Sequence, residues 1–411
     1  MLPEFATLPP LSLYIHLPWC VRKCPYCDFN SYEAGGAIPD LAYVDALLRD
    51  LALEQPLAGE RALVSIFLGG GTPSLFSGEA ITRLLDGVRA RVTLADDCEI
   101  TLEANPGTAE AERFEAFRAA GVNRLSMGVQ SFRDPQLRGL GRIHDSGEAR
   151  KAYAMARAAG FDNINLDLMY ALPEDDVAGA LFDLKAAIAL APAHLSWYQL
   201  TLEPDTAFYH RPPRLPEDER VADMEEAGRA LLQASGFRQY EVSAYASAGR
   251  DCRHNRNYWE FGDYLGIGAG AHGKLTDPAG HCLRRRARQR NPRTYMKLAG
   301  TAAAWIEDSV QDPSRLITEF MMNALRLNEG VPLQIFEDRT GLPAASLAPM
   351  LARARSRGMM EDAAPRLQAT ARGLRYLNDL IGLFADCRAA GAEAVAVRTA
   401  AGVSIQAKVG S

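Results

Sequence analysis

The sequence has no long hydrophobic run and no excess of positive charge. No apolar stretch approaches the roughly 20 residues that a membrane-spanning helix requires, and the first residues do not resemble a secretory signal. The chain has 51 Asp and Glu against 45 Lys and Arg, which gives a formal net charge of −6. We therefore expect a cytoplasmic protein that does not bind nucleic acid and has at most peripheral contact with a membrane.

Cysteine is also scarce, and its distribution is uneven. Of 7 cysteines, four stand alone, whereas Cys20, Cys24 and Cys27 lie close together. Single cysteines in a cytoplasmic protein argue against disulfides. A structural zinc site is another alternative, but zinc normally takes four ligands and no second Cys or His pair follows at a usual spacing. Three thiolates can instead hold three corners of a [4Fe–4S] cluster and leave the fourth iron open to a small molecule.

Short apolar segments alternate with amphipathic ones along the first 200 residues. Six strand–helix units predict a parallel sheet with crossover helices, either doubly wound or closed into a partial barrel. The barrel is favoured because polar motifs follow the carboxyl ends of the strands, where barrels carry their active sites. The expected strands are residues 13–17, 65–68, 99–103, 124–129, 164–170 and 195–201, and the expected helices include residues 41–54, 109–120 and 177–190.

The rest of the chain predicts a smaller second domain. A helix at 216–235 and a β-like stretch at 239–245 precede a loop-rich segment that reaches about residue 314. Helices at 316–327, 333–339 and 345–356, a hairpin after Gly358 and a helix from Thr370 are typical of a winged-helix-like domain. DNA binding is disfavoured because the expected recognition helix has only Arg353 and Arg355 as basic residues. The expected divisions are 1–235 for the barrel, 236–314 for an extension of it, 315–388 for the C-terminal domain and 389–411 for a tail, disordered or a small hairpin.

Four motifs lie at the ends of successive predicted strands. The glycines of Gly69-Gly-Gly-Thr-Pro let the backbone approach a ligand closely. Glu103 ends the third strand, Gln130 ends the fourth with Arg142 twelve residues beyond it, and Asp167 lies on the fifth. A buried acid requires a partner or a ligand. Each motif alone is compatible with a structural cap or ion pair, but their concentration at one end of the sheet favours a binding site.

The spacing Cys20-x3-Cys24-x2-Cys27 resembles the signature of radical S-adenosylmethionine (SAM) enzymes, in which the open iron binds SAM. With the motifs above, it resembles the subfamily of oxygen-independent coproporphyrinogen III dehydrogenase (HemN) and its paralogue HemW over about residues 11–380. The resemblance implies an α/β fold, a partial (β/α)6 TIM-like barrel followed by a small winged-helix-like α+β domain. The residues that it assigns to cofactor binding are Tyr14, Tyr26, Gly70, Gly71, Thr72, Glu103, Gln130, Arg142 and Asp167, with Thr201 as a weaker match.

Three features resemble HemW more than HemN. Phe29 stands where the dehydrogenase has a fourth cysteine, only thirteen residues precede Tyr14, and the run from His254 to Trp259 matches an HNxxYW signature. HemW proteins are regarded as haem chaperones, so the resemblance implies haem as a ligand. A neutral imidazole can ligate haem iron, and we expect His254 to do so beside Tyr258 and Trp259, unless it is an ordinary core histidine.

Two further features leave alternatives open. His272 is a second candidate haem ligand or a structural histidine. The arginine-rich run 284–290 predicts a solvated loop, or a site for haem propionates or anionic lipid.

The resemblance implies a chaperone that delivers haem to haem-accepting apoproteins of the respiratory chain. The alternative is an enzyme that oxidatively decarboxylates coproporphyrinogen. We also expect an electron donor for the cluster and a homodimer, and we assign no catalytic residue.

Overall fold

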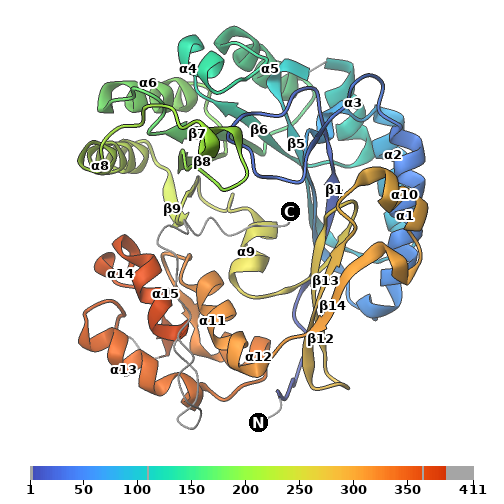
Figure 1. Cartoon of the computed structure of the whole chain (residues 1–411), viewed down its shortest axis with the longest axis vertical. Helices are drawn as coiled ribbons and strands as arrows, with labels where there is room; N and C mark the ends of the chain where they lie inside the picture. Colours follow the sequence, from blue (N-terminus) through green and yellow to red (C-terminus); the bar gives the residue numbers. More distant parts are fainter. Residues whose placement is uncertain (1–2, 109–110, 363–364, 386–411) are drawn as a thin grey trace.

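The computed structural model describes residues 3–108, 111–362 and 365–385. These residues form a 12-stranded sheet in the order β14-β13-β12-β11-β1-β4-β5-β6-β7-β8-β10-β9 (Figure 1). Its six consecutive strands from β1 to β8 are parallel, which confirms the predicted six-unit partial barrel. They are β1 (Leu11–Leu17), β4 (Leu63–Gly70), β5 (Leu94–Ala104), β6 (Arg124–Gln130), β7 (Ile164–Tyr170) and β8 (His194–Gln199).

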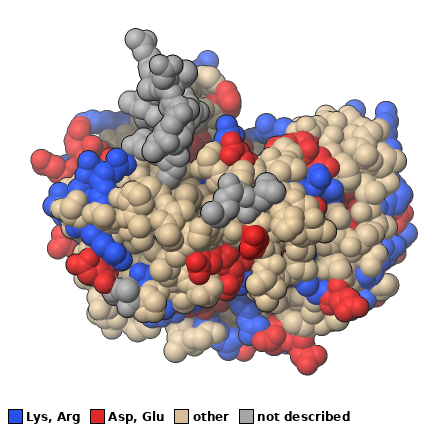
Figure 2. Space-filling model, turned by 90° about the horizontal axis from the view of Figure 1, so that it is seen from below, with Lys and Arg blue, Asp and Glu red and all other residues tan. Residues whose placement is uncertain are grey.

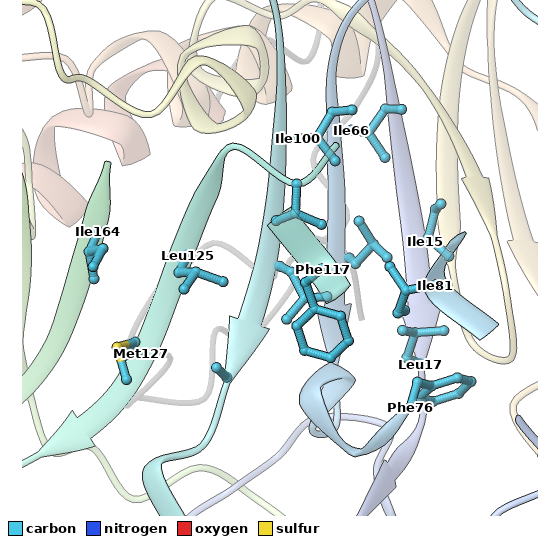
Figure 3. Close-up of a cluster of buried hydrophobic side chains, with 14 of the residues drawn as sticks. Ile15, Leu17, Ile66, Phe76, Ile81, Ile100, Phe117, Leu125, Met127 and Ile164 are labelled. Atoms are coloured by element: carbon cyan, nitrogen blue, oxygen red, sulfur yellow. The ribbon is translucent and has the colours of Figure 1, made fainter. Parts of the chain in front are cut away.

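Helices cover the outer face of these strands (Figure 1). Apolar residues at alternate positions of the strands, such as Ile15 and Leu17 on β1, belong to one buried cluster with side chains of the helical layer such as Ile81 and Phe117 (Figure 3). The intervening positions, such as Tyr14 and His16, face the barrel interior. The helices of this layer are α1 (Asp40–Ala58), α2 (Gly78–Arg89), α3 (Ala111–Ala120), α4 (Asp134–Gly139), α5 (Ser146–Ala158), α6 (Val177–Ile188) and α8 (Asp218–Ala234).

The prediction of a loop-rich segment before residue 314 was wrong, because most of this segment extends the sheet. β11 (Asp263–Ile267) pairs in parallel with β1, and three antiparallel strands continue the sheet outward. At the opposite edge two antiparallel strands follow β8, as the β-like stretch at 239–245 predicted. The further elements are β9 (Arg238–Glu241), β10 (Ala244–Ala246), α9 (Arg253–Trp259), β12 (His272–Asp277), β13 (Cys282–Arg288), α10 (Pro292–Leu298) and β14 (Trp305–Val310).

The arginine-rich run is therefore strand β13 and not a solvated loop. Guanidinium groups of β13 pair with carboxylates from other elements: Arg285 with Glu319, and Arg288 with Asp50 and Glu54 of α1. Arg290 lies just beyond β13 and is exposed, and its Nε lies 3.5 Å from Asn30 Oδ1. The paired arginines of β13 are therefore not available as a free cationic surface for propionates or lipid.

The C-terminal domain has the predicted order of elements. A bridge between Met360 and Ala369 closes the expected hairpin after Gly358. Its apolar core also contains Tyr258 and Trp259, so α9 packs between the barrel and this domain (Figure 1). The elements are α11 (Pro313–Ala324), β15 (Val331–Pro332), α12 (Leu333–Thr340), α13 (Ala348–Ser356), β16 (Arg366–Leu367), α14 (Ala371–Arg375) and α15 (Leu377–Ala385), and the predicted tail 389–411 lies outside the described residues.

The surface charge and the apolar character of the helices can be described from the folded chain. On the face drawn in Figure 2, basic and acidic residues are interspersed and form no extended field of one sign. Among the described residues, no helix combines the length and apolar character needed to cross a bilayer.

Candidate functional site

The three clustered cysteines lie in one loop at the carboxyl end of β1. Cys20 belongs to the short strand β2 (Trp19–Cys20), which pairs in parallel with β3 (Tyr32–Glu33) and so closes the loop on itself. The amide of Cys27 donates to the carbonyl of Cys24 over 3.1 Å. All three thiols are free and half-buried.

The surroundings of these thiols fit an iron–sulfur cluster. Arg142 Nη1 lies 3.5 Å from Cys24 Sγ as a hydrogen-bond donor, and the hydroxyl of Ser31 lies 3.9 Å from Cys27 Sγ. Such hydrogen bonds to sulfur are typical of cluster sites. Burial raises the pKa of Cys27 to about 11, so bound cations would be needed to keep this thiol ionised. In the described residues, no group of three His, Cys, Asp or Glu side chains could hold a single metal ion. In an iron–sulfur cluster, by contrast, each cysteine binds a different iron atom.

The glycine-rich turn packs directly on the strand that leads into the cysteine loop. The amide of Gly71 donates to the carbonyl of Leu17 and the amide of Thr72 to that of Trp19, over 2.9 and 2.8 Å. A Cβ on Gly71 would lie 2.6 Å from the Trp19 carbonyl oxygen, and one on Gly70, whose φ is +112°, would overlap the ring of His16. These glycines therefore permit close contact between two strand ends, which brings the glycine turn beside the cysteines.

Two carboxylates face the same end of the barrel. Glu103 Oε2 accepts a 3.0 Å hydrogen bond from the amide of Gly70. Burial, and then the negative charge of Asp167, raise the pKa of Glu103 to about 8. Asp167 accepts from Asn165 Nδ2 at 2.8 Å and from Ser126 Oγ at 3.1 Å, and burial raises its pKa as well. This end of the barrel can therefore stabilise a cationic ligand, which would favour the ionised carboxylates.

The raised pKa of Glu103 predicts a pH-dependent stability. A carboxyl whose pKa is higher in the folded state than the usual 4.5 binds more protons when folded, so the wild-type chain loses stability as the pH rises from about 5 to 8. Glu103→Gln keeps an acceptor for Gly70 and removes this titration. We expect urea unfolding to show that this variant gains stability relative to the wild type across that interval; a constant difference would contradict the assignment.

Other residues predicted to bind the cofactor reach the same region. Arg142 Nη2 donates to the carbonyl of Gly128 at 2.5 Å, and Gln130, with a φ of +70°, accepts from the Tyr198 hydroxyl at 2.9 Å. Tyr26 packs against Phe208 of the short helix α7 (Ala207–His210), with ring centroids 6.3 Å apart.

A small pocket lies between these motifs. It joins the cysteine loop to the glycine turn, to the Glu-Ala-Asn-Pro segment and to the Arg142 segment. The lining residues are Val21, Arg22, Cys24, Thr72, Asn105, Gly141, Arg142 and Ile143.

Two residues that were predicted to bind the cofactor form hydrogen bonds with other side chains of the protein. Thr201 lies two residues beyond the end of β8 and donates to Glu203 Oε1 at 2.9 Å. Tyr14 is 3% exposed, and its hydroxyl lies 2.9 Å from His16 Nδ1, so it supports the histidine below the glycine turn. Direct contact of either side chain with a cofactor stays a prediction.

The structure does not bring His254 to the cysteine loop. His254 is fully buried on α9, and its Nδ1 bonds to Ser65 at the amino-terminal part of β4, whereas the glycine turn follows the carboxyl end of that strand. Its Nε2 bonds to the Tyr258 hydroxyl at 2.9 Å. Burial, with a smaller effect of Arg124, lowers the pKa of His254 to about 3. Haem ligation by this neutral histidine stays a prediction, and it requires one of these hydrogen bonds to break. His272 is exposed at the start of β12.

Several interior residues were missed by the sequence analysis. His194, Ser196 and Tyr198 occupy alternate positions of β8, and Asn165 lies two positions before the predicted Asp167 on β7. Polar residues at every second position of an otherwise apolar strand indicate a polar barrel interior. Only residues at strand ends were considered in the sequence analysis, so this signal was not used.

Family models match both parts of the chain. The radical SAM superfamily model matches residues 14–184, and the HemN C-terminal domain model matches residues 311–376. The heme chaperone HemW of Escherichia coli is 51% identical over 377 residues, which cover 92% of this chain and 98% of that protein. The chain belongs to the HemW family.

Other comparisons agree with this membership. The heme chaperone HemW of Haemophilus influenzae is 49% identical and covers 92% of this chain and 98% of its own. Among solved structures, coproporphyrinogen III oxidase (HemN) from Escherichia coli has a TM-score of 0.77 and 25% identity, covering 92% of this chain and 91% of that one. This chain thus shares with HemN an α/β radical SAM fold that extends through the C-terminal domain.

Proposed function

We propose that this protein is a haem chaperone that carries a [4Fe–4S] cluster on Cys20, Cys24 and Cys27 and binds SAM beside it. The main support for this proposal is the similarity of the chain, over nearly the whole length of both sequences, to proteins named heme chaperones. The half-buried cysteine loop beside the glycine turn supports the cofactor part of the proposal.

The chain itself would hold and orient SAM. When bound, the cluster supplies an open iron and an electron for the sulfonium cofactor. Glu103 and Asp167 provide negative charge at the end of the barrel, and Arg142 bridges the cysteine loop to β6. The proposed contacts are those of the sequence analysis: Tyr14, Tyr26, Gly70, Gly71, Thr72, Glu103, Gln130, Arg142, Asp167 and Thr201.

The enzymatic alternative is less well supported. Coproporphyrinogen oxidation is the activity in the name of the HemN structure, whose similarity at this identity concerns the fold, whereas the curated relatives of higher identity are named as chaperones. In this chain Phe29, which is 46% exposed, stands in place of the additional cysteine expected of the dehydrogenase.

An anaerobic comparison tests the function. Reconstituted protein is titrated with haem, with and without SAM, and is incubated separately with coproporphyrinogen, SAM and a reductant. We expect saturable haem binding and no vinyl-bearing product. Formation of that product, or the absence of saturable haem binding, would contradict the chaperone function.

The same proposal implies further partners. Haem-requiring apoproteins of the respiratory chain would receive the haem, and an electron donor would reduce the cluster. Homodimerisation is part of the proposal and is tested by the molar mass in solution with and without haem.

A further inference from the structure

A continuous chain of buried polar groups runs through the barrel interior from Asp167 to the start of α9. Asn165 Nδ2 lies 2.8 Å from Asp167 Oδ1, and Asn165 Oδ1 lies 2.7 Å from His194 Nδ1. His194 Nε2 lies 2.9 Å from the Tyr240 hydroxyl, which also lies 3.2 Å from the amide of Cys252, the residue that precedes α9. Asn165, His194 and Tyr240 are exposed by only 2%, 1% and 0%.

The direction of every hydrogen bond in this chain is determined. The Asn165 amide nitrogen must face the Asp167 carboxylate, because a carboxylate accepts, so its carbonyl oxygen faces His194. His194 therefore donates from Nδ1, and burial lowers its pKa well below the usual value, which keeps the ring neutral. Nε2 must then accept from the Tyr240 hydroxyl, whose oxygen accepts from the Cys252 amide. The chain thus polarises in one direction, from α9 toward Asp167.

The start of α9 is tied to the barrel by a second buried group. Glu99 Oε1 accepts from the amide of His254 at 3.3 Å and from Cys252 Sγ at 3.5 Å. Arg124 is 2% exposed, and its Nε has no hydrogen-bond partner among the described residues. Its charge interacts with Glu99, beside the start of α9, and with Asp167 at the other end of the chain.

We propose that His194 and Tyr240 are positioning residues that orient Asp167 for SAM and link that orientation to helix α9. This inference rests on the proposed function, because it takes Asp167 as part of the SAM site. The carbonyl oxygen of Asn165 accepts from both His194 and Ser196, which fixes the orientation of its amide, and Tyr240 holds His194 in one tautomer. A ligand that displaces α9 removes the Cys252 donor and loosens the chain, so SAM binding and the HNxxYW segment respond to each other.

Removing the Tyr240 hydroxyl tests the link. Tyr240→Phe deletes one buried donor that bonds to His194 and not to Asp167, so the hydrogen-bonded route from this hydroxyl to the SAM site runs through His194 and Asn165. We expect the Kd for SAM of the reconstituted protein to rise about fivefold, the size of one ordinary hydrogen bond. The nitrogen NMR signals of His194 should also change, because Nε2 loses its donor.

Tyr153→Phe is the matched control. Tyr153 is also buried and donates one hydrogen bond, to the carbonyl of Ala191, but it lies on α5 outside the barrel. This variant should leave both the Kd for SAM and the His194 signals unchanged. Wild-type-like SAM affinity in Tyr240→Phe would overturn the inference alone, whereas a wild-type protein that binds no SAM would overturn the proposed function with it.

Two further measurements keep the test decisive if Tyr240→Phe does not fold. In the wild-type chain, nitrogen NMR must show His194 as the neutral Nδ1–H tautomer, and the Nε2–H tautomer or a charged ring would overturn the inference. Asn165→Asp places a second carboxylate beside Asp167 and is expected to weaken SAM binding by more than Tyr240→Phe does. Equal SAM affinity of Asn165→Asp and the wild type would also overturn it.

Discussion

Replacing Arg288 with methionine is expected to lower the free energy of unfolding by about 3–5 kcal/mol. Arg288 is 1% exposed on β13; its Nε contacts both oxygens of Asp50 at 3.0 and 2.9 Å, and its Nη2 contacts Glu54 Oε1 at 2.5 Å. Asp50 also accepts from the Tyr295 hydroxyl. Methionine would leave the buried carboxylate of Asp50 without its cation, and Glu54 would keep only Arg286, whose Nη1 lies 3.2 Å from Glu54 Oε1. Urea unfolding followed by circular dichroism measures the loss.

Arg284→Met on the same strand is the control for this effect. Arg284 has a side chain that is 38% exposed and pairs with Asp308 at 3.3 Å, so its loss should cost less than about 1 kcal/mol. Adding Asp50→Asn to Arg288→Met should recover part of the stability, because it removes the uncompensated charge. Equal losses for the Arg284 and Arg288 variants would show that burial of the ion pair does not decide its contribution.

Replacing Cys24 with serine should abolish nearly all cluster binding after anaerobic reconstitution. Cys24 lies at the pocket beside Thr72 and Arg142, and a serine hydroxyl is a poor substitute for a thiolate ligand of iron. Bound iron and sulfide per chain, and the visible absorbance of the cluster, measure the result. SAM binding should be lost with it.

Cys282→Ser separates this ligand effect from general sensitivity to cysteine loss. Cys282 is a free thiol that is 9% exposed at the start of β13, which pairs with the edge strand β14 and is separated from β1 by β11 and β12 in the sheet order. Its variant should reconstitute like the wild type. Retention of wild-type iron by Cys24→Ser would contradict the cluster assignment.

The barrel and the proximity of the motifs could be predicted because each motif lies at the carboxyl end of a strand that the local sequence predicts. The strand before Cys20 is apolar, and the cysteines, the glycine turn and Glu103 each follow a strand end. Since parallel strands place their carboxyl ends at one edge, these segments meet in space. Their order along the sequence was therefore sufficient to predict that these segments lie together, whereas their contacts with a cofactor stay a prediction.

The outer part of the sheet could not be predicted because its stability depends on distant residues. The residues next to Arg288 in the sequence predict a solvated loop. Its partners Asp50 and Glu54 lie more than 200 positions earlier, on α1, so the neighbouring sequence gives no sign of these ion pairs. The HNxxYW signature had the same limitation. It identified His254 as chemically able to bind iron, but the burial of this ring between Ser65 and Tyr258 arises from packing among the barrel, α9 and the C-terminal domain.

Electron paramagnetic resonance of the reduced, reconstituted protein with and without SAM is the most direct test of the account. If Cys20, Cys24 and Cys27 hold a [4Fe–4S] cluster with one iron open to SAM, the spectrum must change when SAM is added. A spectrum that is identical with and without SAM, or reconstituted protein that holds zinc in place of iron, would contradict the central claim.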